Sequence, residues 1–277
     1  DATSTRNATS ARVYRALARS RVGGSLLGRM SSEASLTAAL EAAGQGHLLH
    51  PPPPPEKREA FLSELQKLDL PGLRSTFERS MSGVAEERHV EPFTDVTELA
   101  KMSEAEVAAL RADGLALIAA GKTAALLLAG GQGTRLGSSA PKGCYDIGMP
   151  SGKSLFQYHA ERIISVKRLA AAHAGIEEAA VRLLFLVMTS ESTGDETRAF
   201  FAKHAHFGLP QDQVVFFDQG TMPCFSLEGE LLRSAPGELA TAPNGNGGAY
   251  LALRDSGVLA RLQADGVEGL FQFGVDH

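Results

Sequence analysis

A glycine-rich turn followed by two basic residues is the stretch of this sequence best suited to chemistry. The apolar run Leu126–Ala129 leads into Gly130–Gly137, which contains Arg135, and Lys142 follows in a Pro-Lys-Gly triplet. Glycines let main-chain N–H groups approach a ligand closely, and fixed positive charge beside them favours anions. The pattern therefore predicts a phosphate-binding loop at the end of a buried strand.

The spacing of these glycines excludes the two most familiar phosphate-binding loops. Gly131, Gly133 and Gly137 give G-x-G-x-x-x-G, whereas a dinucleotide-binding loop requires G-x-G-x-x-G. The segment Gly148–Ser154 is one residue short of a P-loop, and no apolar strand precedes it. What remains is G-G-x-G-T-R-L followed by P-K, a combination of strand, loop, Arg and Lys in a fixed order.

Strands alternate with helices from residue 121 onward, which predicts an α/β fold with a mostly parallel sheet. Strands are expected at residues 124–128, 181–188, 214–217 and 269–275. Helices are expected at 154–172 behind a capping box at Ser154–Gln157, at 194–204, and from the loop 244–248 to Leu253. A hairpin over 225–233 should turn at Glu228–Gly229.

The part before the sheet is predicted to be helical over residues 30–120, with residues 121–277 forming the nucleotide-binding catalytic domain. Helices are expected at 31–50, 56–68, 71–82 and 103–117, the last opened by a capping box at Ser103–Glu106. The Pro51–Pro55 run should form a stiff, extended spacer. We expect this helical layer to pack against the sheet.

Residues 1–29 differ from the rest, with six arginines among Ser, Thr and Ala and Asp1 as the only acid. This composition favours a disordered or transit-peptide-like leader, or translated sequence upstream of a start at Met30. A net charge of −5 over 277 residues argues against a dedicated nucleic-acid binder. No apolar run approaches the roughly 20 residues of a membrane span. The two cysteines, Cys144 and Cys224, form no disulfide framework and are interpreted as apolar filler.

Polar or glycine-rich sets follow four of the expected strands. They are the glycine loop, Met188–Ser190, Asp218–Gly220 and Asp276–His277. Because open α/β sheets bind ligands at the carboxyl ends of their strands, we expect these sets to converge, joined by the Asn244–Gly248 loop.

The sequence resembles the eukaryotic-type UDP-N-acetylglucosamine pyrophosphorylases, a branch of the UDP-sugar pyrophosphorylases, from about Met30 to its end. The motifs that carry the resemblance are Ala43–Leu49, Leu127–Gly137, Pro141–Gly143, Ser154–Gln157, Met188–Ser190, Phe217–Gly220, Ala242–Gly248 and Val275–Asp276. It implies a Rossmann-like nucleotidyltransferase sheet, here incomplete because family members continue well past Asp276. Two positions depart from the family pattern, since Asn244 replaces a usual Asp and His277 a usual Asn.

The resemblance also implies roles for individual residues. Arg135 and Lys142 would bind the UTP phosphates and stabilise charge during catalysis, and Asp276 would hold Mg²⁺. Gln219 would hydrogen-bond uracil, and Asn246 would contact the sugar. The complete set implied for nucleotide and sugar binding is Leu128, Ala129, Gly130, Gly131, Gln219, Gly245 and Asn246.

The implied reaction joins UTP to N-acetylglucosamine 1-phosphate and gives UDP-N-acetylglucosamine and pyrophosphate. Two alternatives stay open. The chain could be a truncated, non-catalytic form that at most binds UTP or a partner, or it could serve another sugar 1-phosphate. A cytoplasmic location is expected from the family, or an organelle if residues 1–29 are a transit peptide. The sequence does not indicate an oligomeric state.

Overall fold

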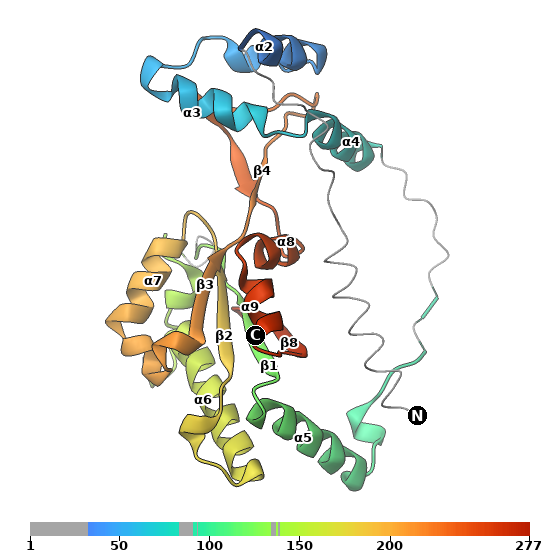
Figure 1. The fold of residues 1–277 in the computed structure, drawn as a ribbon, viewed down its shortest axis with the longest axis vertical. Helices are drawn as coiled ribbons and strands as arrows, with labels where there is room; N and C mark the ends of the chain where they lie inside the picture. The colour runs from blue at the N-terminus through green and yellow to red at the C-terminus, as the bar shows by residue number, and fades with distance from the viewer. Residues whose placement is uncertain (1–32, 83–90, 93, 134–136, 138) are drawn as a thin grey trace. The chain divides into compact units, whose positions relative to one another are not determined.

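The computed structural model describes residues 33–82, 91–92, 94–133, 137 and 139–277. Contacts divide the chain into two compact units, each visible in Figure 1. The first, here called the helical unit, combines the chain up to Thr94 with Thr221–Ala242. The second, the sheet unit, combines Asp95–Gly220 with Pro243–His277. Beyond residue 30, the sequence predicts one division of the chain, between residues 120 and 121. The contacts instead divide it after Thr94 and again around Thr221–Ala242. The predicted leader at residues 1–29 lies outside the described residues.

The sheet unit is built on four parallel strands in the order β3-β2-β1-β8. Their bounds are Thr123–Leu128 for β1, Leu184–Thr189 for β2, Val214–Asp218 for β3 and Gly269–Gly274 for β8. The predicted parallel α/β sheet is confirmed. The sheet is open, and Phe271 on the edge strand β8 is 68% exposed.

Strand β2 begins three residues later than the predicted start at Val181. A 3₁₀ turn at Glu178–Ala180 precedes the strand. The main-chain N–H of Leu183 then donates to the side chain of Gln213 (3.4 Å) rather than to a strand neighbour. The prediction, which relied on apolar character, therefore started the strand before its hydrogen-bonded part.

Alternate residues of β1 enter two different cores, one on each face of the sheet. Leu127 packs with α6 (Leu155–Ala174) and α7 (Gly194–Lys203). Leu126 packs with α8 (Gly248–Asp255) and α9 (Val258–Ala264). Figure 1 shows these helix pairs on opposite sides of the strands. Because both faces are covered, β1 and β2 are apolar without alternation.

Helix α5 (Glu104–Ala119) belongs to the sheet unit and packs on α6, where Leu115 and Ile118 meet Ala170 and Ala171. Its predicted capping box at Ser103 is confirmed, with both the side-chain and the main-chain bonds to Glu106 present.

The predicted capping box at the start of α6 is only half formed. The Ser154 hydroxyl accepts from the Gln157 N–H (3.2 Å), but the Gln157 side chain donates to Glu161 (3.1 Å) instead of returning to the cap. Glu161 also holds Lys153 in an ion pair (2.7 Å), so one carboxylate accepts from both side chains. The helix ends at Gly175 in the left-handed conformation.

The helical unit contains α2 (Glu33–Ala42), α3 (Pro55–Gln66) and α4 (Leu70–Met81). The helix predicted over 31–50 ends at Ala42, because Gly44 takes a positive φ and a 3₁₀ turn follows at Gly46–Leu49. The proline run is not entirely a spacer, since Pro55 occupies the first position of α3, where its missing N–H costs nothing.

The Ala43–Leu49 motif holds the hairpin predicted at 225–233. Gln45 spans it with two bonds, from its amide to Gly229 O (3.0 Å) and from the Leu231 N–H to its oxygen (2.8 Å). The turn is confirmed at Gly229, whose φ is +90°, and Phe225 pairs with Leu231 across it. Making both bonds requires a side chain with one N–H donor and one oxygen acceptor, as an amide has. This explains a polar residue at the buried position 45.

Short strands complete this segment, and the sequence analysis does not predict them. They are β4 (Thr221–Pro223) with β7 (Thr241–Pro243), and β5 (Arg233–Ala235) with β6 (Glu238–Leu239). In the described part of the chain, no helix has the length and apolar character needed to cross a membrane.

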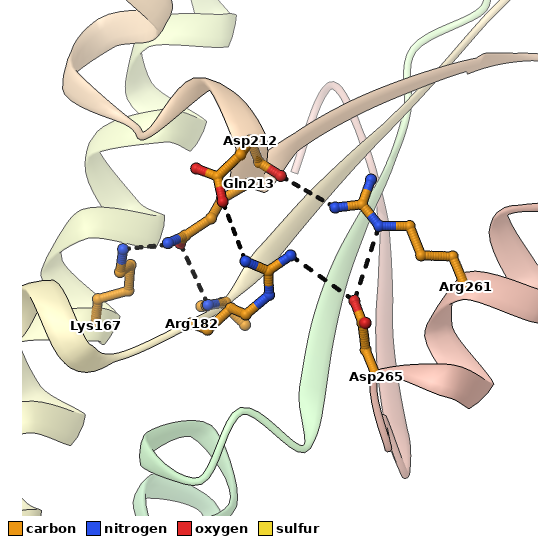
Figure 2. Close-up of polar contacts among 7 residues, drawn as sticks. Lys167, Arg182, Asp212, Gln213, Arg261 and Asp265 are labelled. Atoms are coloured by element: carbon orange, nitrogen blue, oxygen red, sulfur yellow. Dashed lines mark hydrogen bonds and ion pairs between the residues drawn. The ribbon is translucent and has the colours of Figure 1, made fainter.

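Figure 2 shows a polar network at the amino ends of β2 and β3. Arg182 bonds to the carboxylate of Asp212 (3.1 Å) and lies 3.8 Å from that of Asp265. Arg261 on α9 donates to the main-chain oxygen of Asp212 (3.1 Å). This part of the network is exposed, so each ion pair contributes little by itself.

The buried part of the network is the contact between Lys167 on α6 and Gln213. The Lys167 ammonium donates to Gln213 Oε1 (2.9 Å), and the lysine is 4% exposed. Burial lowers the pKa of Lys167 below its ordinary value, because the charged form loses hydration. The amide oxygen of Gln213 thus accepts the hydrogen bond of a buried ammonium, which the carboxylates of Glu178 and Asp212 also favour.

We predict that Gln213→Leu destabilises the sheet unit by roughly 2–3 kcal/mol, because it leaves the Lys167 ammonium buried without an acceptor. Adding Lys167→Met should recover much of this loss, since an apolar group of similar length then replaces the charge. Urea unfolding of the two single variants and the double variant measures the coupling. Equal stability of Gln213→Leu and the double variant would contradict this account.

Candidate functional site

A cavity of about 410 Å³ opens at the carboxyl ends of β1, β3 and β8. The predicted site residues that line it are Leu128, Gly130, Gly131, Lys142, Gln219, Gly245, Asn246 and Asp276. Ala129 is buried behind the lining, and Arg135 lies outside the described residues. The structure therefore brings together the predicted residues that it describes, from five separate segments, although their chemical roles stay predictions.

A larger cavity of about 460 Å³ lies elsewhere in the sheet unit, between α5, α6 and β8. Its lining is almost entirely apolar, apart from Thr123, His159 and Arg162. It contains none of the predicted site residues. We take the smaller cavity as the candidate site because charged and amide groups converge there, as recognition of a polar ligand requires.

The glycine loop approaches the segment after β3 so closely that a side chain at Gly130 would collide with it. A Cβ on Gly130 would lie 2.4 Å from the amide nitrogen of Gln219. Gln219 is itself positioned by its main-chain N–H, which donates to Thr189 O (2.8 Å). Glycine at this point therefore leaves room for the Gln219 amide in the position that it occupies.

Thr189 and Ser190 support the loop from below and do not line the cavity. This corrects the expectation that the Met188–Ser190 set would join the binding surface. The Ser190 hydroxyl donates to Gly130 O (2.8 Å), and the Thr189 hydroxyl bonds to the Asp218 carboxylate. Both residues are at least 97% buried, so the Ser190 hydroxyl holds the glycine loop and the Thr189 hydroxyl holds the end of β3.

Lys142 reaches the cavity through a return of the chain against the glycine loop. Gln132 forms a bridge with Pro141, and the Lys142 N–H donates to Gly131 O (3.1 Å). The Lys142 ammonium then forms an ion pair with the carboxylate of Asp276, at the end of β8. The lysine side chain is 30% exposed and the aspartate 58%, so a ligand entering the cavity can reach both.

The cavity offers few side-chain ligands to a divalent cation. Among the described residues, no group of three or more His, Cys, Asp or Glu side chains is arranged to hold a metal. Asp276 is the only carboxylate among the described residues that line the cavity. One carboxylate fits Mg²⁺ when a nucleotide supplies phosphate oxygens, since this ion keeps several waters and needs few protein ligands. It does not fit a preformed site for a metal bound without substrate.

The Asn244–Gly248 loop forms the remaining wall. Gly245 has a φ of +76°, and Gly248 N–H closes the turn onto Gly245 O (3.0 Å). A Cβ on Gly248 would lie 1.7 Å from the side-chain oxygen of Asn244. That oxygen is buried and has no partner among the described residues. The loop is therefore tightly folded around Asn244, which leaves Asn246 on the cavity wall.

Residues 74–277 match the family described as UTP–glucose-1-phosphate uridylyltransferase. The chain belongs to this family. It is 42% identical over 230 residues to UDP-N-acetylglucosamine diphosphorylase 2 of Arabidopsis thaliana. This match covers 80% of this chain and 45% of that protein. It is 37% identical over 222 residues to a probable UDP-N-acetylglucosamine pyrophosphorylase of Schizosaccharomyces pombe, covering 80% and 46%. The resemblance inferred from the motifs is confirmed.

Solved structures of the family share the fold. The uridine diphosphate N-acetylglucosamine pyrophosphorylase from Trypanosoma brucei, in complex with inhibitor, has a TM-score of 0.66 and 28% identity, covering 90% of this chain and 52% of that one. The chain thus spans about half the length of the relatives it matches.

Two residues of the site are absent from the prediction. Gly274 lines the cavity beside the predicted pair Asp276 and His277, and His159 on α6 contacts the main chain beneath it. No signal in the sequence marks His159, because it lies on the apolar face of a helix, where a histidine usually serves packing. Only the pairing of β8 with β1 brings α6 under the end of β8.

Gly143→Ala should destabilise the sheet unit by about 1–3 kcal/mol. A Cβ there would lie 2.2 Å from the ring of Phe156, which is fully buried and cannot move aside. Thermal unfolding checks this, with Gly131→Ala as the control because its Cβ would meet nothing within 4 Å. If the two variants lost equal stability, the close contact would not be what requires glycine in the Pro-Lys-Gly triplet.

Cys144 should be a slow nucleophile despite its position two residues after Lys142. Burial raises the pKa of its thiol to about 11. At pH 8 the thiolate is then about a hundredfold scarcer than in an ordinary cysteine, because the model-peptide pKa is near 9. Iodoacetamide labelling of a Cys224→Ser variant, before and after unfolding in urea, measures this. Fast labelling of the folded chain would contradict it.

Proposed function

We propose that this chain carries the UTP-binding part of a uridylyltransferase that makes UDP-N-acetylglucosamine and pyrophosphate from UTP and N-acetylglucosamine 1-phosphate. The observation that carries the proposal is the convergence of the glycine loop, Lys142, Gln219 and Asp276 on one cavity. Its volume lies within the range usual for small-molecule sites. The names of the relatives support the choice of sugar.

The proposed reaction is a direct displacement. An oxygen of the sugar 1-phosphate forms a bond to the α-phosphorus of UTP, while the bond from that phosphorus to the β-phosphate oxygen breaks. Pyrophosphate leaves with the electron pair of that bond. Such transfers depend on positioning and charge stabilisation more than on covalent help, so no side-chain nucleophile is required.

Lys142 would neutralise phosphate charge in this displacement, and Arg135 would share the task. Because Lys142 is paired with Asp276 before substrate arrives, binding must redistribute this pair. Phosphate oxygens would take the ammonium, and the released carboxylate would hold Mg²⁺, which supplies further charge neutralisation when bound. Main-chain groups of Leu128–Gly131 would fix the nucleotide, with Gln219 at uracil and Gly245 and Asn246 beside nucleotide and sugar.

A binding-only form is the second candidate function, and the exposed edge of the described sheet favours it. The chain covers 45% of its Arabidopsis relative, and its sheet ends at an exposed edge strand. Release of pyrophosphate from UTP and N-acetylglucosamine 1-phosphate distinguishes catalysis from binding alone. A preference for another sugar 1-phosphate would instead contradict the proposed substrate.

A cytoplasmic location is proposed together with this reaction. The distribution of a fluorescent fusion of the chain in cells tests it.

We expect the chain to bind UTP in calorimetric titrations, with higher affinity when Mg²⁺ is present. Lys142→Ala should weaken UTP binding about tenfold or more, because a charge-assisted contact to phosphate is lost. Lys153→Ala is the matched control, since Lys153 pairs with Glu161 (2.7 Å) and does not line the cavity.

Gln219→Ala tests the base. It should reduce the preference for UTP over CTP, because the amide is the group proposed to hydrogen-bond the uracil edge.

An equal loss of UTP affinity in the Lys142 and Lys153 variants would show that the loss comes from the overall charge of the chain and not from a contact in the cavity. Absence of UTP binding by the folded chain would remove the proposed function.

A further inference from the structure

The main chain around Asp276 is fixed by more contacts than its side chain is. The Asp276 carboxylate has one described partner, the ammonium of Lys142. By contrast, the Val275 N–H donates to Leu128 O (3.3 Å), and the His277 N–H donates to Gly274 O (3.2 Å). Two side chains of α6 add to this, as His159 bonds to Val275 O (2.9 Å) and Arg162 to His277 O (2.7 Å).

His159 is an unusual residue for its position. It is 3% exposed, on a helix face where Phe156, Ala160 and Ile163 are buried in the apolar core. Its ring also lies against Phe273 of β8, with centroids 5.2 Å apart. A purely structural position here would suit an apolar side chain better, because a buried polar group is costly unless it is bonded.

Only one of the two ring nitrogens of His159 is bonded. Since a carbonyl oxygen can only accept, Nε2 carries the proton and donates to Val275 O. Nδ1 is buried and has no partner among the described residues. The ring therefore makes one directed bond, to the peptide group that precedes Asp276.

We propose that His159 is a positioning residue for Asp276, fixing the direction in which its carboxylate leaves the end of β8. This inference rests on the proposed function, in which Asp276 holds Mg²⁺ beside the UTP phosphates.

The geometry supports this role. The oxygen of Val275 and the nitrogen of Asp276 belong to one planar peptide group. Holding that oxygen from α6 fixes the plane that precedes Asp276, and the His277 N–H bond to Gly274 fixes the plane that follows. The Asp276 side chain is thus aimed at Lys142 without a direct contact from His159. Groups bonded directly to a metal ligand are worth about ten- to a hundredfold in metal affinity. Because His159 acts through the main chain, we expect an effect at the lower end of that range.

Two variants of the full chain separate positioning from packing. His159→Gln keeps an N–H donor near the position of Nε2, whereas His159→Leu keeps the volume and loses the donor. Lys167→Met, two turns further along α6, controls for removing a buried polar group from the same helix.

The first readout needs no ligand. Hydrogen exchange of the segment 270–277 should be about five- to tenfold faster in His159→Leu, as expected for one lost hydrogen bond. His159→Gln and Lys167→Met should retain the original exchange rate there. Unchanged exchange in His159→Leu, or equally fast exchange in His159→Gln, would overturn the proposal whether or not a nucleotide binds.

The second readout is the gain in UTP affinity on adding Mg²⁺, measured by calorimetry. His159→Leu should lose about tenfold of this gain and leave binding of UTP without Mg²⁺ unchanged, and His159→Gln should restore the gain. An equal loss with and without Mg²⁺ would indicate a structural role only and would overturn the proposal. Failure of the unmodified chain to bind UTP, together with faster exchange in His159→Leu, would count against the proposed function and leave the hydrogen-bond role standing.

Discussion

The central position of β1 is the constraint on which the site depends. This strand pairs with β2 on one side and with β8 on the other, and both of its faces are covered. The chain proceeds from β1 to β2 and β3, then returns to place β8 on the opposite side of β1. The strand order therefore reverses between β1 and β8, the position at which open α/β sheets bind ligands. The ion pair of Lys142 with Asp276 spans this position.

The strands can place the loops but cannot orient them, because their side chains are apolar. Orientation comes from a layer of buried polar groups beneath the cavity. Ser190 holds the carbonyl of Gly130, and His159 holds that of Val275, each from an element adjacent to the strand end that it serves. A buried hydrogen bond to a main-chain oxygen fixes a peptide plane at a net stability of about 1 kcal/mol. The value of such groups to the molecule is direction rather than stability.

The sequence predicts most of the sheet because that information is local. An apolar run such as Leu126–Leu128 followed by glycines identifies both the strand and its loop, and the Ser103 capping box is read from two residues. Convergence of Gln219 with Gly130 was also predictable, since carboxyl ends of parallel strands share one edge. What sequence could not give depends on contacts that are distant along the chain. The Gln157 amide turned to Glu161 rather than to its cap, and His159 acquired its partner only through the pairing of β8. The short helix α9 lacked enough residues to display a period.

Asn244 shows how burial limits the charge that a residue beside the cavity can carry. Its main-chain N–H donates to Gly220 O (3.1 Å), which closes the loop over the end of β3. Its side-chain oxygen is buried without a described partner, pressed against Gly248. An ionised carboxylate in this place would have to give up its hydration at a cost of several kcal/mol, whereas a neutral amide gives up much less. The amide thus keeps the loop folded and adds no negative charge to a cavity that we expect to receive a triphosphate. Asp276 is the one carboxylate in the described lining, so the orientation of its side chain decides what the cavity can offer a cation.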